Sequence, residues 1–185
     1  MEQQFQYYAF ISYKREDEKW AKWLQDRLRW YKLPSKLCRQ ITRLPKKVWP
    51  VFRDNTDLDS GRLEENIRHE LERSHYLIVI CSPEAARSPW VGKEVKYFAT
   101  LHGADKIIPF VVSGIPYSND IETECIHEQI KAISQEELLA INVREEGIGS
   151  FAMKKKRAFI RVVARLLDIK FNTFCLLYTS PSPRD

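Results

Sequence analysis

The chain has 185 residues, of which 44% are hydrophobic and 30% are charged, and its formal net charge is +5. That length suits one compact domain, or one domain with a tail, and the composition excludes disordered and collagen-like chains. No apolar run approaches the roughly 20 residues that cross a bilayer, and the N-terminus lacks the pattern of a signal peptide. The four cysteines have no CxxC spacing, so we expect neither disulfides nor a zinc site, and a reducing, cytoplasmic location.

Apolar periodicity predicts strands and helices that alternate along the chain. The expected elements are a strand at 7–12, a helix at 15–32, a strand at 48–52, a helix at 63–75, a strand at 76–81, a helix at 90–102, a strand at 107–112, a helix at 122–133, a strand at 138–143 and a helix at 151–167. The strands are uniformly apolar, which is typical of a parallel sheet that is buried on both faces.

This alternation predicts an α/β fold of the flavodoxin-like, doubly wound class, with five parallel strands and helices on both faces. Ligands of such sheets bind beyond the carboxyl ends of the strands. The loops that follow the first four strands should therefore form the functional rim, at 12–16, 53–61, 82–90 and 113–119.

Two segments do not follow the pattern. Residues 34–47 form a basic connection without a clear period, which we interpret as solvated rather than as an assembly surface. Residues 175–185 show no helical period and resemble translated sequencing-adapter DNA. We therefore expect a domain at 1–174, a non-native tail at 175–185, and a natural C-terminal region that is missing here.

The positive charge is concentrated in two stretches. Residues 14–47 hold twelve Lys and Arg against four Asp and Glu, and residues 150–170 hold seven against one. Such stretches fit a solvated helix face, nucleic acid, or a small anion such as a dinucleotide. No nucleic-acid motif supports the second of these interpretations.

Several kinds of catalytic motif are missing from the sequence. It contains no HExxH, GxGxxG, GxxxxGK[ST] or nucleophile-elbow pattern, which argues against a zinc protease, a Rossmann dehydrogenase and a P-loop enzyme. We expect no metal site.

Two segments of the rim carry candidate chemistry. Ser12, Tyr13 and the two cations that follow could receive a phosphate or stack on a base, although for this segment alone an ordinary strand-to-helix turn capped by Ser12 is the favoured explanation. Trp90 and Glu94 are four residues apart and share one helix face. They could contact a sugar and a base, or they could be a core Trp beside a solvated Glu.

Together these segments resemble a Toll/interleukin-1 receptor (TIR) domain, over about residues 6–170. The resemblance rests on FISY at 10–13, VFRD at 51–54, LIVICSP at 77–83 and WVGKE at 90–94. These strings are closest to those of bacterial members.

The resemblance implies an enzyme that cleaves the nicotinamide–ribose bond of NAD⁺. Glu94 takes the catalytic position, NAD⁺ is a substrate, and no cofactor is needed. The product would be ADP-ribose or a cyclic ADP-ribose isomer, made in bacterial anti-phage immune signalling. The implied substrate-binding residues are Phe10, Ser12, Tyr13, Lys14, Arg15, Asp54 and Trp90.

The family also implies a partner, a second copy of the chain. A mobile segment, the BB loop, helps to complete the site of a neighbouring copy, and a head-to-tail contact of this kind builds a filament. Here that loop includes Asp57, Leu58, Ser60 and Gly61. We expect no nucleic-acid or membrane partner. The alternative is a non-catalytic TIR module that recruits partners through the same loop.

Overall fold

The computed structural model describes residues 5–41, 44–53, 61–133, 140–144 and 149–179. At its centre lies one sheet, in which every pair of neighbouring strands is parallel. The strand order is β2-β1-β3-β4-β5, which is the flavodoxin-like order expected from the sequence. The strands are β1 (Tyr7–Ser12), β2 (Val51–Arg53), β3 (Ser74–Cys81), β4 (Ile107–Val111) and β5 (Ile141–Asn142).

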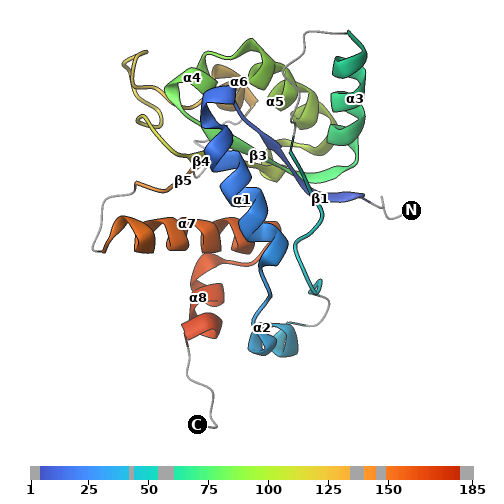
Figure 1. Ribbon diagram of the computed structural model, residues 1–185, viewed down its shortest axis with the longest axis vertical. Helices are drawn as coiled ribbons and strands as arrows, with labels where there is room; N and C mark the ends of the chain where they lie inside the picture. The colour runs from blue at the N-terminus through green and yellow to red at the C-terminus, as the bar shows by residue number, and fades with distance from the viewer. Residues whose placement is uncertain (1–4, 42–43, 54–60, 134–139, 145–148, 180–185) are drawn as a thin grey trace.

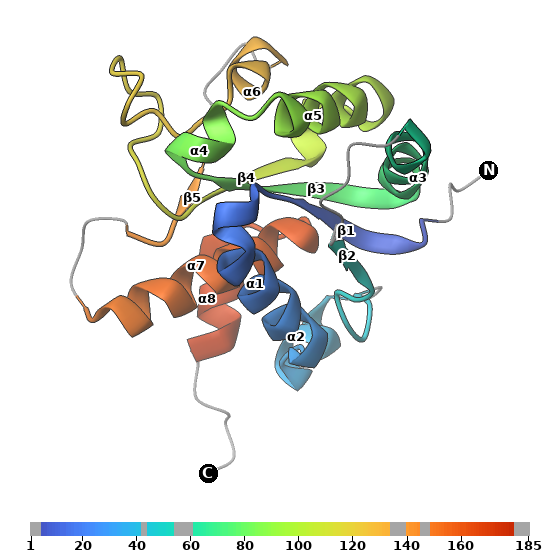
Figure 2. The same cartoon turned by 45° about the horizontal axis from the view of Figure 1, so that its top comes forward.

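Helices cover both faces of this sheet, as expected (Figures 1 and 2). Helices α3, α4, α5 and α6 lie on one face, and α1, α2, α7 and α8 lie on the other (Figure 2). Their bounds are α1 (Glu18–Trp30), α2 (Ser35–Gln40), α3 (Gly61–Glu72), α4 (Pro83–Ala86), α5 (Pro89–His102), α6 (Glu128–Ile133), α7 (Phe151–Leu166) and α8 (Phe171–Thr179). Two short 3₁₀ helices are η1 (Arg15–Asp17) and η2 (Ala104–Lys106).

The sheet separates two apolar layers, because successive side chains of a strand point to opposite faces. In β1, Ala9 and Ile11 join the layer under α1 and α7. Phe10 joins the layer under α3 and α5. Both layers are formed by fully buried side chains, which explains why the strands show no polar alternation.

The chain changes faces between β1 and β3, which are neighbours in the sheet. After β1 it continues into α1 on one face, and after β3 it continues into α4 and α5 on the other (Figure 2). Strands that lead to opposite faces leave a crevice at their carboxyl ends, where α/β proteins bind ligands. Ser12 closes β1, in register with Val79, and Ser82 follows β3 directly.

The segment at 34–47 contains more structure than its sequence predicts. It forms α2, and Leu37 of this helix is buried in the core. The interpretation of a merely solvated connection is therefore wrong for this part. A six-residue helix with one core side chain is too short to produce a visible apolar period.

The C-terminal segment also differs from expectation, because α8 runs through Cys175 to Thr179. The expected loss of helix after residue 174 is wrong. The division into a domain at 1–174 and a non-native tail remains a prediction. Helix α6 is shorter than predicted, because residues 115–124 form a loop closed by a bridge between Ile115 and Glu124.

The four cysteines are free thiols. Within the described ranges, no helix has both the length and the apolar character to cross a membrane. Nor do three or more His, Cys, Asp or Glu side chains cluster there as metal ligands would.

Candidate active site

Glu94 lies in the second turn of α5, and the sequence before it determines where that helix begins. Ser88 is the N-cap, with its hydroxyl accepting from the Val91 N–H at 3.4 Å, and Pro89 takes the first helical position. Both residue types are favoured at these positions. The helix start therefore directs Trp90 and Glu94 towards the carboxyl ends of β1 and β3.

The Glu94 carboxylate is buried, with 4% of the residue exposed. The hydroxyl of Ser12 donates a hydrogen bond to its Oε2. A buried carboxylate needs such donors, because burial removes the water that would otherwise solvate it. The bond joins the end of β1 to α5 and holds the carboxylate in one orientation.

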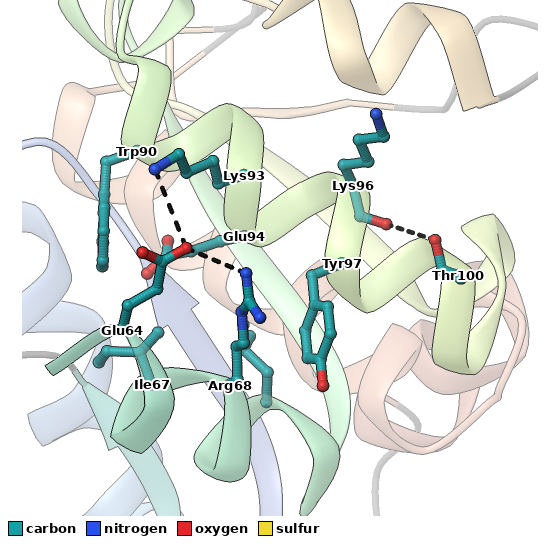
Figure 3. Close-up of a pocket in the computed structure, with 10 residues that line it drawn as sticks. Glu64, Ile67, Arg68, Trp90, Lys93, Glu94, Lys96, Tyr97 and Thr100 are labelled. Atoms are coloured by element: carbon teal, nitrogen blue, oxygen red, sulfur yellow. Dashed lines mark hydrogen bonds and ion pairs between the residues drawn. The ribbon is translucent and has the colours of Figure 1, made fainter. Parts of the chain in front are cut away.

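A cavity of about 290 Å³ opens beside Glu94, between α3 and α5 (Figure 3). Its lining combines apolar side chains with charged ones, as ligand pockets do. The lining residues are Glu64, Ile67, Arg68, Leu71, Trp90, Lys93, Glu94, Lys96, Tyr97 and Thr100.

Charged side chains meet across the mouth of this cavity (Figure 3). The Glu64 carboxylate lies 3.0 Å from the Arg68 guanidinium and 3.9 Å from the Lys93 ammonium. The same ammonium lies 5.8 Å from the centre of the Trp90 ring. Two cations, an aromatic face and a buried carboxylate therefore surround one space, and they suit a ligand with anionic, aromatic and sugar parts.

Tyr97 lines the cavity one turn beyond Lys93. Its hydroxyl donates to Glu72 at 2.5 Å, and this bond is the main reason why the pKa of Tyr97 is raised. The Arg68 guanidinium lies 5.3 Å from the centre of its ring. Arg68 is thereby held between Glu64 and an aromatic face.

The structure brings some of the predicted site residues together and separates others. Ser12, Trp90 and Glu94 meet at the cavity or directly beside it. Phe10 lies beneath the site, fully buried and stacked on Phe52 with ring centres 5.2 Å apart.

Tyr13, Lys14 and Arg15 are absent from the cavity lining. The Tyr13 ring packs against the other apolar layer, and its hydroxyl accepts from Arg53 at 3.1 Å. Lys14 and Arg15 form the start of η1, with Arg15 exposed. In this structure the cations at the cavity come from α3 and α5 instead.

The predicted loop residues Asp54, Asp57, Leu58 and Ser60 lie outside the described residues. Gly61, predicted with them, begins α3. This helix also carries Glu64 and Arg68.

A second buried carboxylate, which the sequence analysis did not single out, lies at the same edge of the sheet. The Ser82 hydroxyl donates to Asp17 at 2.5 Å and accepts from the Ala85 N–H, so it also caps α4. Burial raises the pKa of Asp17, against the lowering effect of the Ser82 bond. This pair ties η1 to the end of β3 and stabilises the floor of the crevice.

The cavity residues on α3 were also missed. Glu64 and Arg68 have the spacing of an ordinary exposed helical ion pair, which is far commoner than a ligand site. Only the packing of α3 against α5 places them opposite Lys93. For the α5 side of the cavity the sequence does contain a signal, because Lys93 and Tyr97 are four residues apart and so share a helix face.

Comparison with known proteins identifies the class. The family model described as a TIR domain matches residues 9–146. The chain belongs to the TIR-domain family.

Two relatives show what the chain is similar to. It is 36% identical over 110 residues to a protein named NAD(+) hydrolase ApTIR, from Actinoplanes sp. (strain ATCC 31044 / CBS 674.73 / SE50/110). That match covers 58% of this chain but only 14% of the relative's length. Among solved structures, the TIR domains of the activated Roq1 resistosome that directly recognises the pathogen effector XopQ align with a TM-score of 0.53. They are 14% identical, over 83% of this chain and 98% of the other, which supports the fold alone.

Proposed function

We propose that this TIR domain cleaves the nicotinamide–ribose bond of NAD⁺. The observation that carries the proposal is the buried carboxylate of Glu94, held by Ser12 at the edge of a cavity that also exposes Trp90. The similarity to a protein named as an NAD⁺ hydrolase supports the same activity.

The chemistry explains why one carboxylate is enough. Most glycosidases need two, because the leaving oxygen must be protonated. In NAD⁺ the pyridinium nitrogen already carries the positive charge. When its bond to the ribose breaks, the electron pair moves to that nitrogen and nicotinamide leaves as a neutral molecule. No general acid is required.

The protein must then stabilise the cationic ribose that remains. Glu94 would do so by its charge and by accepting hydrogen bonds from ribose hydroxyls, from a position that Ser12 has fixed in advance. Water attacks the ribose carbon and releases a proton, which gives ADP-ribose. If an adenine nitrogen attacks instead and a proton is lost, the product is a cyclic ADP-ribose, which contains one water fewer than ADP-ribose. Both products need the same carboxylate.

The lining of the cavity suggests how the dinucleotide would lie. Trp90 would stack on a ring of the substrate close to Glu94, and Lys93 and Arg68 would contact the pyrophosphate. The cavity, at about 290 Å³, lies just below the range for ligand pockets, which is about 300–1,000 Å³. It would therefore hold only part of the dinucleotide.

We further propose that the active form is an assembly of copies, in which the loop before α3 completes a neighbour's site, and that the product serves bacterial anti-phage signalling. The family resemblance supports the first of these. The structurally similar TIR domains belong to a resistosome. For this chain, turnover per molecule should rise with protein concentration.

The test is incubation with NAD⁺ at high protein concentration, with products separated by chromatography and identified by mass. Glu94→Gln keeps the size of the side chain and one acceptor oxygen but removes the charge and the second acceptor, and it should abolish nicotinamide release. The matched control is Glu65→Gln, because Glu65 is an exposed residue of α3 outside the cavity lining. Equal turnover by wild type and Glu94→Gln would contradict the proposal. Self-association without turnover would favour the non-catalytic module.

A further inference from the structure

His127 lies between the first turns of two helices, and its hydrogen bonds assign its tautomer. The Gln129 N–H donates to Nδ1 at 3.0 Å, so this nitrogen carries no proton. The proton is on Nε2, which lies 3.1 Å from the carbonyl oxygen of Ser88 and donates to it. The ring therefore caps α6 with one nitrogen and bonds the start of α5 with the other.

The carbonyl oxygen of Ser88, at the start of α5, accepts two hydrogen bonds. It accepts from the Gly92 N–H at 3.1 Å, as the first bond of the helix, and also from His127. The Ser88 hydroxyl meanwhile accepts from the Val91 N–H. The imidazole is thus bonded to the turn that carries Trp90 and leads to Glu94.

Gly92 explains how the ring can approach so closely. A Cβ at this position would lie 2.5 Å from Cε1 of His127 and 2.8 Å from its Nε2. Glycine is a poor helix former, and nothing about a buried helical position favours it except space. Here the space beside Gly92 is filled by the imidazole edge that carries Cε1 and Nε2, on the side of α5 opposite the face shared by Trp90 and Glu94.

The ring is neutral in this setting. Burial is the main cause that lowers the pKa of His127. Of the charges that act on it from α6, Glu128 raises the pKa and Lys131 lowers it. A neutral ring with one donor and one acceptor satisfies both of its bonds at neutral pH.

We propose that His127 is a positioning residue for Glu94, acting through Ser88 and Gly92 to hold the first turn of α5 against the carboxyl edge of the sheet. This inference rests on the proposed function, since what is positioned is the proposed catalytic carboxylate. It predicts that the bond to Ser88, rather than the cap of α6, controls turnover.

Two substitutions of His127 test its bond to Ser88 and its bond to the Gln129 N–H separately. His127→Asn keeps an acceptor for the Gln129 N–H, because Asn is a strong helix N-cap, but it is too short to reach Ser88. His127→Gln has an amide N–H at about the position of Nε2 and keeps that donor. We expect Asn to lower kcat roughly 10- to 100-fold, with a smaller change in KM, because small displacements of a catalytic group have effects of that size. His127→Gln should keep most of the wild-type activity.

Gly92→Ala provides an independent variant, because its methyl group would occupy the place of the ring. It should reproduce the loss of kcat seen with His127→Asn, and the double variant should lose little more. Equal effects of Asn and Gln on kcat, or additive effects of Gly92→Ala and His127→Asn, would overturn the proposal.

A second readout needs no turnover. Amide hydrogen exchange of Val91 and Gly92 reports whether the first turn of α5 is held. His127→Asn should accelerate exchange at both amides, and His127→Gln should not. If the wild type releases no nicotinamide, the proposed function fails and these exchange rates still decide whether His127 holds α5. Unchanged exchange in the Asn variant would overturn the positioning role.

Discussion

Ser12 and Glu94 are 82 residues apart in sequence, yet the hydroxyl of the first donates a hydrogen bond to the carboxylate of the second. Both side chains are almost fully buried. The bond joins the last residue of β1 to α5 across the point where the chain changes faces of the sheet. This bond holds the carboxylate that the proposed function places at the centre of the site.

Removing the Ser12 hydroxyl leaves a buried carboxylate without this donor. Ser12→Ala should therefore lower the free energy of unfolding by about 1–3 kcal/mol, which urea denaturation can measure. It should also lower kcat, because Glu94 would no longer be held in one orientation. The double variant with Glu94→Gln should lose less stability than the sum of the two single losses. Additive losses would show that the two groups act independently.

Glu64 forms ion pairs with both cations at the mouth of the cavity and offsets part of their positive charge. Glu64→Gln should make that mouth more positive and strengthen the attraction of an anionic dinucleotide. An exposed ion pair is worth up to about 1 kcal/mol, so KM for NAD⁺ should fall by up to about 5-fold. The gain should shrink as salt is raised, because salt screens exposed charges.

The control for this prediction is again Glu65→Gln, which removes the same charge from the exposed part of α3. If both variants changed KM equally, the effect would come from net charge alone. That result would contradict the assignment of Arg68 and Lys93 as the pyrophosphate contacts.

Three histidines with lowered pKa values allow a prediction of how the free energy of unfolding depends on pH. Burial is the main cause that lowers the pKa of His75, His102 and His127. As the pH falls below the unfolded value of 6.5, the unfolded chain binds protons that the folded chain does not yet bind. The free energy of unfolding should therefore decrease as the pH falls through that value.

Urea midpoints at pH 7.5 and 5.5 test this dependence. The raised pKa of Asp17 has the opposite effect on the free energy of unfolding, because the folded carboxyl binds a proton at a higher pH than the unfolded one does. His75→Phe should flatten the decrease, since Phe keeps the stacking on Phe5, at 4.7 Å between ring centres, without a titrating group. An unchanged slope would rule out His75 as a contributor.

The cysteines should differ in reactivity. Cys81 and Cys125 are buried, and burial raises the pKa of Cys125 to about 12 and that of Cys81 well above its usual value. Because the thiolate is the reactive form, neither should react with a thiol reagent in the folded protein at pH 8. Cys38 is exposed and should react at once. All four should react in urea, and rapid labelling of Cys81 before unfolding would contradict the packing of β3.

The main features of the fold could be predicted because they depend on residue patterns within short segments of the sequence. The uniformly apolar runs that became β1, β3 and β4 are buried on both faces, and the periodic runs that became α1, α5 and α7 each cover one face of the sheet. Where a local signal was weak, the prediction failed. Helix α2 contributes one core leucine, and α8 runs through a segment that shows no helical period.

The sequence by itself determined which residues could carry chemistry near Glu94, because Trp90 and Glu94 share a face of one helix and Ser12 ends a buried strand. Only the tertiary structure decided which partners those residues meet. Tyr13 turned to the opposite layer, while Glu64 and Arg68 came to face Lys93. The reason is physical. Spacing along a helix or strand fixes the face on which a side chain lies, but the packing of α3 against α5 fixes what stands opposite that face.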